Sequence, residues 1–130
     1  MKFFFDNCLS PRLATALNAL VEPEHSVVHL RDKFATPTPD TDWIVRLSEE
    51  GGWIIVSGDL RISKRPTERE VWRAAKLTTF FMADGYQNLD EWQQVRVMIE
   101  KWPQIMDLAE RTGRGSAFRV PIRSRKIETL

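Results

Sequence analysis

The sequence has one cysteine, almost no net charge and no long apolar run, and each shortage excludes a class of protein. A single cysteine, Cys8, cannot form an internal disulfide, which favours a reducing compartment such as the cytoplasm. The Phe3 to Phe5 run is far shorter than the roughly 18 residues that span a bilayer or the about 7 to 15 of a signal peptide. A formal net charge of +1 excludes a generally basic nucleic-acid-binding protein. Charge position must therefore carry any functional argument.

Length and composition predict one α/β domain covering residues 1–130. Hydrophobic residues make up 42% of the chain, which is enough for one core. Short apolar or β-branched runs alternate with amphipathic segments. The expected strands lie at residues 2–6, 26–30, 53–59, 78–82 and 118–123, and the expected helices at about 10–20, 42–51, 68–76 and 88–102. This order predicts three layers, with a mainly parallel sheet of about five strands and helices on both faces.

Local signals define several of these elements. Ser10-Pro11 predicts the start of the first helix, with Leu13, Ala14, Leu17 and Leu20 on its buried face. Asn88 and Glu91 predict a capping box for the last helix. Its expected buried stripe is Trp92, Val95, Ile99 and Trp102. Pro103 should kink or restart this helix, and Pro121 should restrict the final strand to a sheet edge.

Two expected strands end in an aspartate, Asp6 and Asp59, and Asp42 lies in the first turn of the helix between them. The carboxyl ends of parallel strands meet at one edge, so these acids can share a crevice. Clustered carboxylates repel one another unless a cation is present, and Mg²⁺ or Mn²⁺ suits oxygen ligands. Alone, each acid has an ordinary interpretation: Asp6 and Asp42 can cap helices, and Asp59 can lie in a turn.

These segments resemble PIN-like domains. Lys2 to Leu13 is similar to a strand that ends in their acidic motif, and Trp53 to Ile62 to their later strand ending in Ser-x-Asp. Asp42 corresponds to their second acidic position. The resemblance implies an Mg²⁺- or Mn²⁺-dependent endoribonuclease in which Asp6, Asp42 and Asp59 hold the metal. It also implies the toxin of a toxin-antitoxin pair, with an antitoxin protein as a partner.

Two positions depart from the family pattern. Asn7 stands where many relatives have a second acid, and Arg61 stands where many have another aspartate. Glu68 or Glu70, just beyond the basic segment from Arg61 to Arg65, is the candidate replacement ligand. The thinner acidic cluster leaves two alternatives open. One is a degenerate PIN-like domain that binds RNA or a partner protein without cutting, and the other is an aspartate-based phosphotransfer domain, which the missing Asp-x-Asp after the first strand disfavours.

Basic residues gather in two segments. Residues 111–130 contain six basic side chains and one acidic side chain, Glu128. The candidate RNA-binding residues are Arg61, Lys64, Arg65, Arg119, Arg123 and Arg125. Such a cluster can hold an RNA backbone. Two other interpretations are a solvated edge strand and a docking surface for an acidic partner; a homo-oligomer is also compatible with the sequence.

Overall fold

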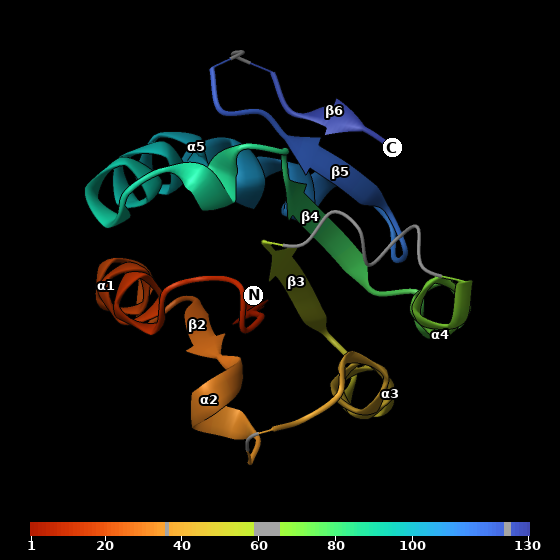
Figure 1. Cartoon of the computed structure of the whole chain (residues 1–130). Helices are drawn as coiled ribbons and strands as arrows, with labels where there is room; N and C mark the ends of the chain where they lie inside the picture. The colour runs from red at the N-terminus through yellow and green to blue at the C-terminus, as the bar shows by residue number, and fades with distance from the viewer. Residues whose placement is uncertain (36, 59–65, 124–125) are drawn as a thin grey trace.

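The computed structural model describes residues 1–35, 37–58, 66–123 and 126–130, which form one sheet flanked by helices (Figure 1). The strands, in the spatial order β2-β1-β3-β4-β5-β6, are β1 (Lys2–Phe5), β2 (Ser26–His29), β3 (Trp53–Ser57), β4 (Thr78–Met82), β5 (Ala117–Val120) and β6 (Glu128–Thr129). The helices are α1 (Pro11–Val21), α2 (Leu30–Lys33), α3 (Asp40–Glu50), α4 (Pro66–Ala75) and α5 (Glu91–Arg111), with a 3₁₀ turn η2 (Tyr86–Asn88).

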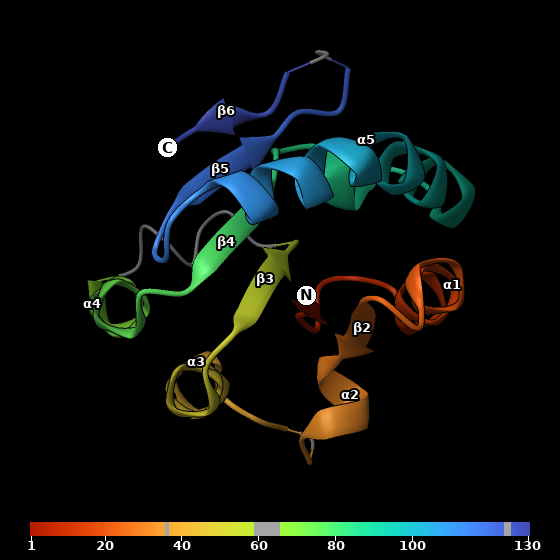
Figure 2. The ribbon, with the colours of Figure 1, turned by 180° about the vertical axis from the view of Figure 1, so that it is seen from behind.

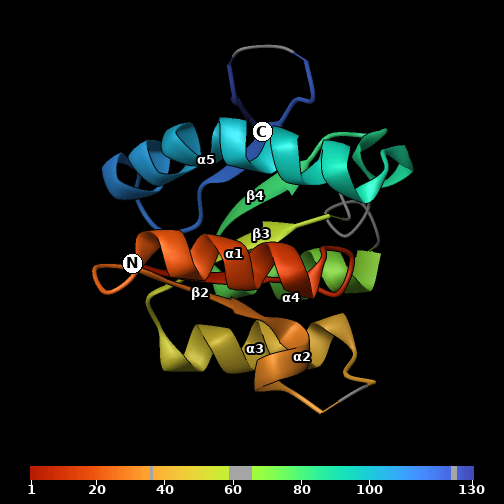
Figure 3. The ribbon, with the colours of Figure 1, turned by 90° about the vertical axis from the view of Figure 1, so that its left-hand side faces the viewer.

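The helices form the two outer layers. In Figures 1 and 2, α1 and α5 lie on one side of the sheet, and α3 and α4 lie on the other. Figure 3 shows α1 and α5 in front of the strands. All pairs among the strands β1 to β5 are parallel, and β6 pairs antiparallel with β5. This arrangement confirms the predicted three-layer α/β fold. None of the described helices is both long enough and apolar enough to cross a membrane.

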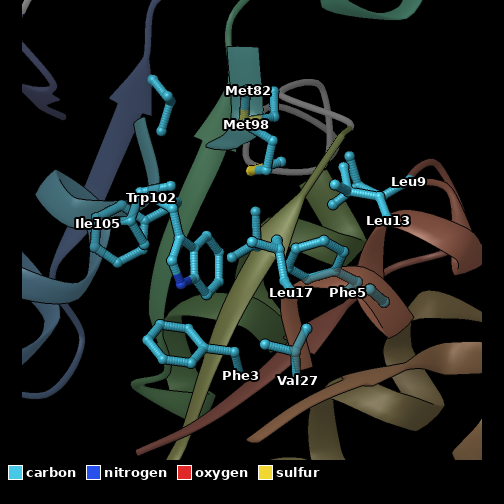
Figure 4. Close-up of a cluster of buried hydrophobic side chains, with 14 of the residues drawn as sticks. Phe3, Phe5, Leu9, Leu13, Leu17, Val27, Met82, Met98, Trp102 and Ile105 are labelled. Carbon is cyan, nitrogen blue, oxygen red and sulfur yellow. The ribbon is translucent and has the colours of Figure 1, made fainter. Parts of the chain in front are cut away.

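The apolar run of β1 is continuous because both faces of the strand are buried. Phe3 and Phe5 contact the layer of α1 and α5, where the ring of Phe3 lies 4.8 Å from that of Trp102 (Figure 4). Phe4 points to the opposite layer, where its ring lies 5.0 Å from that of Trp43. The central strand therefore joins two separate hydrophobic clusters.

The start of α1 agrees with the prediction, but one end of its predicted buried face does not. Ser10 caps the helix by accepting a hydrogen bond from the N–H of Leu13, and Pro11 is the first helical residue. Leu13, Ala14 and Leu17 are buried. Leu20 is 70% exposed, which corrects the predicted face. Helical periodicity predicts the direction in which a side chain points. The side chain is buried only where another strand or helix packs against that part of the helix.

Helix α5 differs from the prediction in three details. Asp90 and Gln93, rather than Asn88 and Glu91, form the capping box, because η2 occupies the preceding residues. Trp92 is 84% exposed and Ile99 is 43% exposed, so the predicted stripe is rotated toward solvent. The helix continues through Pro103, so the predicted restart is wrong, and the predicted kink stays a prediction. Pro103 itself lies on the exposed side of the helix.

The strand predicted at residues 118–123 corresponds to β5 and is not at the edge of the sheet, because β6 lies outside it. Residues Phe118 and Arg119 in β5 pair with Thr129 and Glu128 in β6. Pro121 follows the last residue of β5, so its missing N–H removes no hydrogen bond from this ladder. The two-residue β6 is too short for a hydrophobic pattern to predict, and it covers the strand that the proline signal had placed at the edge.

Candidate active site

The strand register brings three segments together at the carboxyl edge of the sheet. Phe5 lies opposite His29 in β2 and opposite Val56 in β3. The residues that follow these three positions therefore emerge side by side. They are Asp6, the first turn of α2, and the pair Ser57-Gly58. Asp6 follows the end of β1, as the sequence predicted, and the structure places it between the ends of β2 and β3.

Asp6 is the electrostatic centre of this edge. Its side chain is only 3% exposed. One carboxylate oxygen, Oδ1, accepts hydrogen bonds of 3.1 Å from the N–H groups of Cys8 and Gly58, and Oδ2 accepts one from the hydroxyl of Ser57. Burial raises the pKa of Asp6 from 3.8 to about 6; the three hydrogen bonds oppose this increase, and the charge of Asp40 adds to it. The carboxylate of Asp6 is therefore held in one orientation, although burial disfavours its charged form.

The residues Ser57 and Gly58, which precede Asp59, have a direct role in holding Asp6. An added Cβ at Gly58 would lie 2.8 Å from Cys8 Cβ and 2.3 Å from Gln87 Nε2. Because Gly58 has no side chain, the ends of β1 and β3 can approach η2 closely. Gln87 of η2 then donates a hydrogen bond to the Gly58 carbonyl. Both residues of the Ser-Gly pair therefore serve the acid on the neighbouring strand.

Asp40, rather than Asp42, is the acid of α3 that acts on Asp6. Asp40 is half-buried and accepts a 2.9 Å hydrogen bond from the indole of Trp43, which is buried. Its charge contributes to the raised pKa of Asp6, and Asp42 is not among the causes of that increase. Asp42 is exposed and lines a separate pocket with Val45 and Arg46. Its assignment as a metal ligand stays a prediction.

Neither of these two acids caps α3. The N-cap residue is Pro39, which makes no side-chain capping bond, so the ordinary interpretation of Asp40 and Asp42 as caps is wrong. The signal that could have identified Asp40 is its spacing of three residues from Trp43, because residues three apart lie on neighbouring positions of a helix surface. Asp84, two residues beyond β4, lies at the same edge of the sheet and was also missed.

Asn7 contacts a cation that the sequence did not indicate. The side-chain oxygen of Asn7 accepts a 3.1 Å hydrogen bond from Nε of Arg31 in α2. Both residues line a pocket of about 450 Å³ with Leu30, Pro37 and Thr38. The signal for Arg31 was its place in the first turn after β2, at the same edge as Asp6.

Several predicted site residues lie outside the described residues. They are Asp59, Arg61, Lys64, Arg65 and Arg125. Glu68 lies in α4, but its side chain is also outside the described part. Their assignments as metal or phosphate ligands stay predictions.

The two predicted basic residues of the C-terminal segment that are described differ in their surroundings. Arg119 forms a 3.5 Å ion pair with Glu128 of β6. Arg123 is exposed and lines a pocket of about 320 Å³ beside Arg96 and Glu100 of α5. Within residues 1–35, 37–58, 66–123 and 126–130, Arg96 and Arg123 have no ion-pair partner. Arg123 is therefore the more available of the two for an anion.

The donor set at the edge fits a hard divalent cation. The described residues contain no cluster of three metal-binding side chains. Asp6 and Asp40 nevertheless offer only oxygen donors, and a cation would offset the burial of the Asp6 carboxylate, to whose raised pKa the charge of Asp40 adds. Oxygen donors are the ligands that Mg²⁺ and Mn²⁺ prefer. This pair would hold such an ion together with the predicted third ligand, Asp59.

Comparisons with known proteins identify the family. Searches of curated proteins and of solved structures find no match. The PIN like domain family matches residues 1–84, which is more than half of the chain and confirms the resemblance of its motifs. The matched range contains Asp6, Asp40, Asp42 and Asp59 and ends before α5. PIN domains are of nuclease type and generally use divalent metal ions. The chain therefore belongs to the PIN-like domain family.

Proposed function

We propose that this PIN-like domain is an Mg²⁺- or Mn²⁺-dependent endoribonuclease. The observation that carries the proposal is the buried carboxylate of Asp6, which three donors hold in place and whose pKa is raised to about 6 beside Asp40. A carboxylate that only stabilised the fold would gain nothing from a second acid nearby. The arrangement is suited to a cation and, through it, to an anionic substrate.

The proposed roles divide between acidic side chains, which bind the metal ion, and basic side chains, which bind phosphate. Asp6, Asp40 and Asp59 hold the ion, and Asp42 is the alternative ligand from α3. When bound, the ion lowers the pKa of a water and supplies positive charge to a phosphodiester. The protein's own contribution is a fixed set of oxygens, which Ser57 and Gly58 keep in one orientation. Arginines near this edge stabilise the negative charge that develops on the phosphate oxygens.

The RNA path in this proposal runs from Asp6 toward α5. Gln87 in η2 bonds to Gly58, and Leu89, two residues later, lines the pocket that also contains Arg96 and Arg123. These contacts connect the acidic edge with two guanidinium groups that have no ion-pair partner among the described residues. Because guanidinium groups match phosphate oxygens in geometry, this pocket can hold the backbone of a single-stranded RNA beyond the cleavage point.

The test is cleavage of an end-labelled single-stranded RNA by the purified chain with Mn²⁺, with Mg²⁺ and with a chelator. The proposal predicts internal cuts that require metal and that disappear in Asp6→Asn. Arg111→Gln is the matched control, because Arg111 is exposed and paired with Asp107 at the far end of α5. No metal-dependent cleavage by the wild-type chain would contradict the proposal.

A degenerate PIN-like domain that binds RNA without cutting is the second candidate. The hydrogen bond from Arg31 to Asn7 favours it, because an amide and a cation stand where many relatives are expected to carry a second acid. Calorimetric titration with Mn²⁺ separates the two functions. A nuclease should bind metal and lose that binding in Asp6→Asn, whereas a degenerate domain should bind RNA but little metal.

The toxin role and the phosphotransfer alternative have separate tests. Expression of a toxin should arrest growth, and expression of Asp6→Asn should not. An antitoxin would co-purify with the wild-type chain when the adjacent gene is co-expressed. A phosphotransfer domain should instead retain label from a small phosphodonor at an aspartate.

A further inference from the structure

Arg31 is attached to the candidate site through its backbone. Its N–H donates a 3.0 Å hydrogen bond to Nδ1 of His29, so the ring proton of His29 lies on Nε2. Nε2 then donates a 2.7 Å hydrogen bond to the carbonyl of Leu9. His29 is 0% exposed. This buried ring connects the first turn of α2 to the loop that follows Asp6, which fixes the position of Arg31 relative to that acid.

The side chain of Arg31 is oriented by one neutral acceptor. Nε donates to Oδ1 of Asn7, the residue next to Asp6. This bond uses one of the five N–H donors of a guanidinium and leaves the two terminal amino groups. An amide acceptor orients the group without neutralising its charge. A carboxylate at position 7 would form an ion pair and cancel the charge.

No acidic side chain is among the described residues that line the pocket beside Arg31. The pocket of about 450 Å³ beside it is lined by Asn7, Leu30, Pro37 and Thr38, none of which is acidic. Across the described part of the chain, no ion pair involves Arg31, in contrast to Arg111 and Arg119. A guanidinium that one neutral acceptor orients and that borders an open, polar pocket is suited to a planar or tetrahedral oxyanion.

We propose that Arg31, oriented by Asn7, binds a phosphate of the RNA backbone next to the bond that is cut. The inference rests on the proposed nuclease function and identifies how this site holds its substrate. It also gives Asn7 a role: the side chain replaces an expected acid with a neutral holder of a phosphate-binding arginine. The alternative is that Arg31 only attaches α2 to the loop after Asp6.

The test measures RNA affinity against salt concentration in a chelator, so that binding is separated from cleavage. The probe is a short fluorescent single-stranded RNA, and the readout is anisotropy. Arg31→Gln should weaken binding and reduce the slope of log affinity against log salt by about 0.7, the value for one phosphate contact on a single strand. Arg111→Gln, which removes the same charge from an ion pair far from the edge, should leave the slope unchanged.

Two further variants distinguish charge from structure. Asn7→Asp keeps an acceptor for Nε but pairs it with a carboxylate, so the slope should fall as in Arg31→Gln. Arg31→Lys keeps the charge, so the slope should be retained while cleavage in Mn²⁺ slows, because the fork geometry is lost. Thermal melting of each variant verifies that it is folded.

The outcomes separate this inference from the proposed function. If the wild-type chain cuts RNA and Arg31→Gln has the wild-type slope and cleavage rate, the role of Arg31 is wrong and the nuclease proposal stands. If Arg31→Gln lowers the slope, the phosphate contact is supported. If the wild-type chain neither binds nor cuts RNA, both proposals fail.

Discussion

The edge around Asp6 and the C-terminal segment of residues 111–130 both contain charged side chains, but the two regions differ in how far these charges are buried. At the edge, one carboxylate is buried, bonded to three donors and has a raised pKa. In the C-terminal segment, Arg119 is paired with Glu128 and Arg123 is exposed. A charge that is costly to bury requires a local reason, whereas an exposed arginine requires none. Specific chemistry is therefore expected at the edge, and general affinity for RNA at the exposed Arg123 of the C-terminal segment.

The largest effect should come from Asp6→Asn. Cleavage should fall by more than about 100-fold, because a metal ligand is lost. The variant should nevertheless be more stable than the wild type at pH 7, by up to about 3 kcal/mol, since the shift in pKa from 3.8 to about 6 measures the cost of the charged form. Chemical denaturation of both proteins, without metal, measures this difference.

The pH dependence of this difference has a definite sign. The folded state binds the Asp6 proton more tightly than the unfolded state, so wild-type stability falls as pH rises from 3.8 through about 6. The stability gap between Asp6→Asn and the wild type should therefore close below pH 4. Asp42→Asn, a change at an exposed acid, is the matched control. A gap that is the same at pH 3.5 and pH 7 would contradict a raised pKa at Asp6.

The second largest effect should come from Gly58→Ala. The added methyl group would lie 2.8 Å from Cys8 Cβ, and relieving this contact should cost about 1–3 kcal/mol of stability. Cleavage should fall as well, because the N–H of Gly58 helps to orient Asp6. Gly113→Ala is the matched control, since nothing lies within 4 Å of a Cβ there. Denaturation and cleavage assays on both variants test the prediction.

Most of the fold was predictable because buried strands and helix faces require apolar residues at regular positions in the sequence. Runs such as Phe3 to Phe5 are apolar because both faces of β1 are buried, and Ser10-Pro11 begins α1 as expected. The exposed Trp92 was not predictable, because the pattern of α5 gives a direction but not the extent of the neighbouring layer. The sixth strand, β6, depends on a pairing between two distant segments rather than on its own composition.

The site was predictable to the level of strand ends and no further. Asp6 could be identified because an acid ends an apolar run. The choice between Asp40 and Asp42 depends on which face of α3 is buried, and the side chains of Trp43, Ile44 and Leu47 make up that face. Arg31 was missed because its significance lies in a contact with Asn7 that is 24 residues away in the sequence.

The third prediction compares the two acids of α3. Asp40→Asn should reduce Mn²⁺ affinity by at least about 10-fold and lower the pKa of Asp6, because the charge that raises it is removed. Asp42→Asn should change both by much less, since its side chain is exposed and borders another pocket. Calorimetry measures the affinities. A larger loss in Asp42→Asn than in Asp40→Asn would restore Asp42 as the α3 ligand.

The smallest effect should come from the C-terminal segment. Arg123→Gln should reduce the salt slope of RNA binding by about 0.7, as one phosphate contact is lost. Arg119→Gln should reduce it less, because Glu128 already neutralises part of that charge. Neither variant should change Mn²⁺ affinity. Equal slopes for both variants and the wild type would assign these arginines to a protein partner or to solubility.

The most direct test of the central claim is thermal melting of the wild type and Asp6→Asn with and without millimolar Mn²⁺. A cation that binds only the folded state raises the melting temperature of the protein that holds it. The account predicts that Mn²⁺ raises the melting temperature of the wild type and leaves that of Asp6→Asn unchanged. A wild-type melting temperature that Mn²⁺ does not change, or an equal increase in the melting temperature of Asp6→Asn, would contradict a metal site at Asp6.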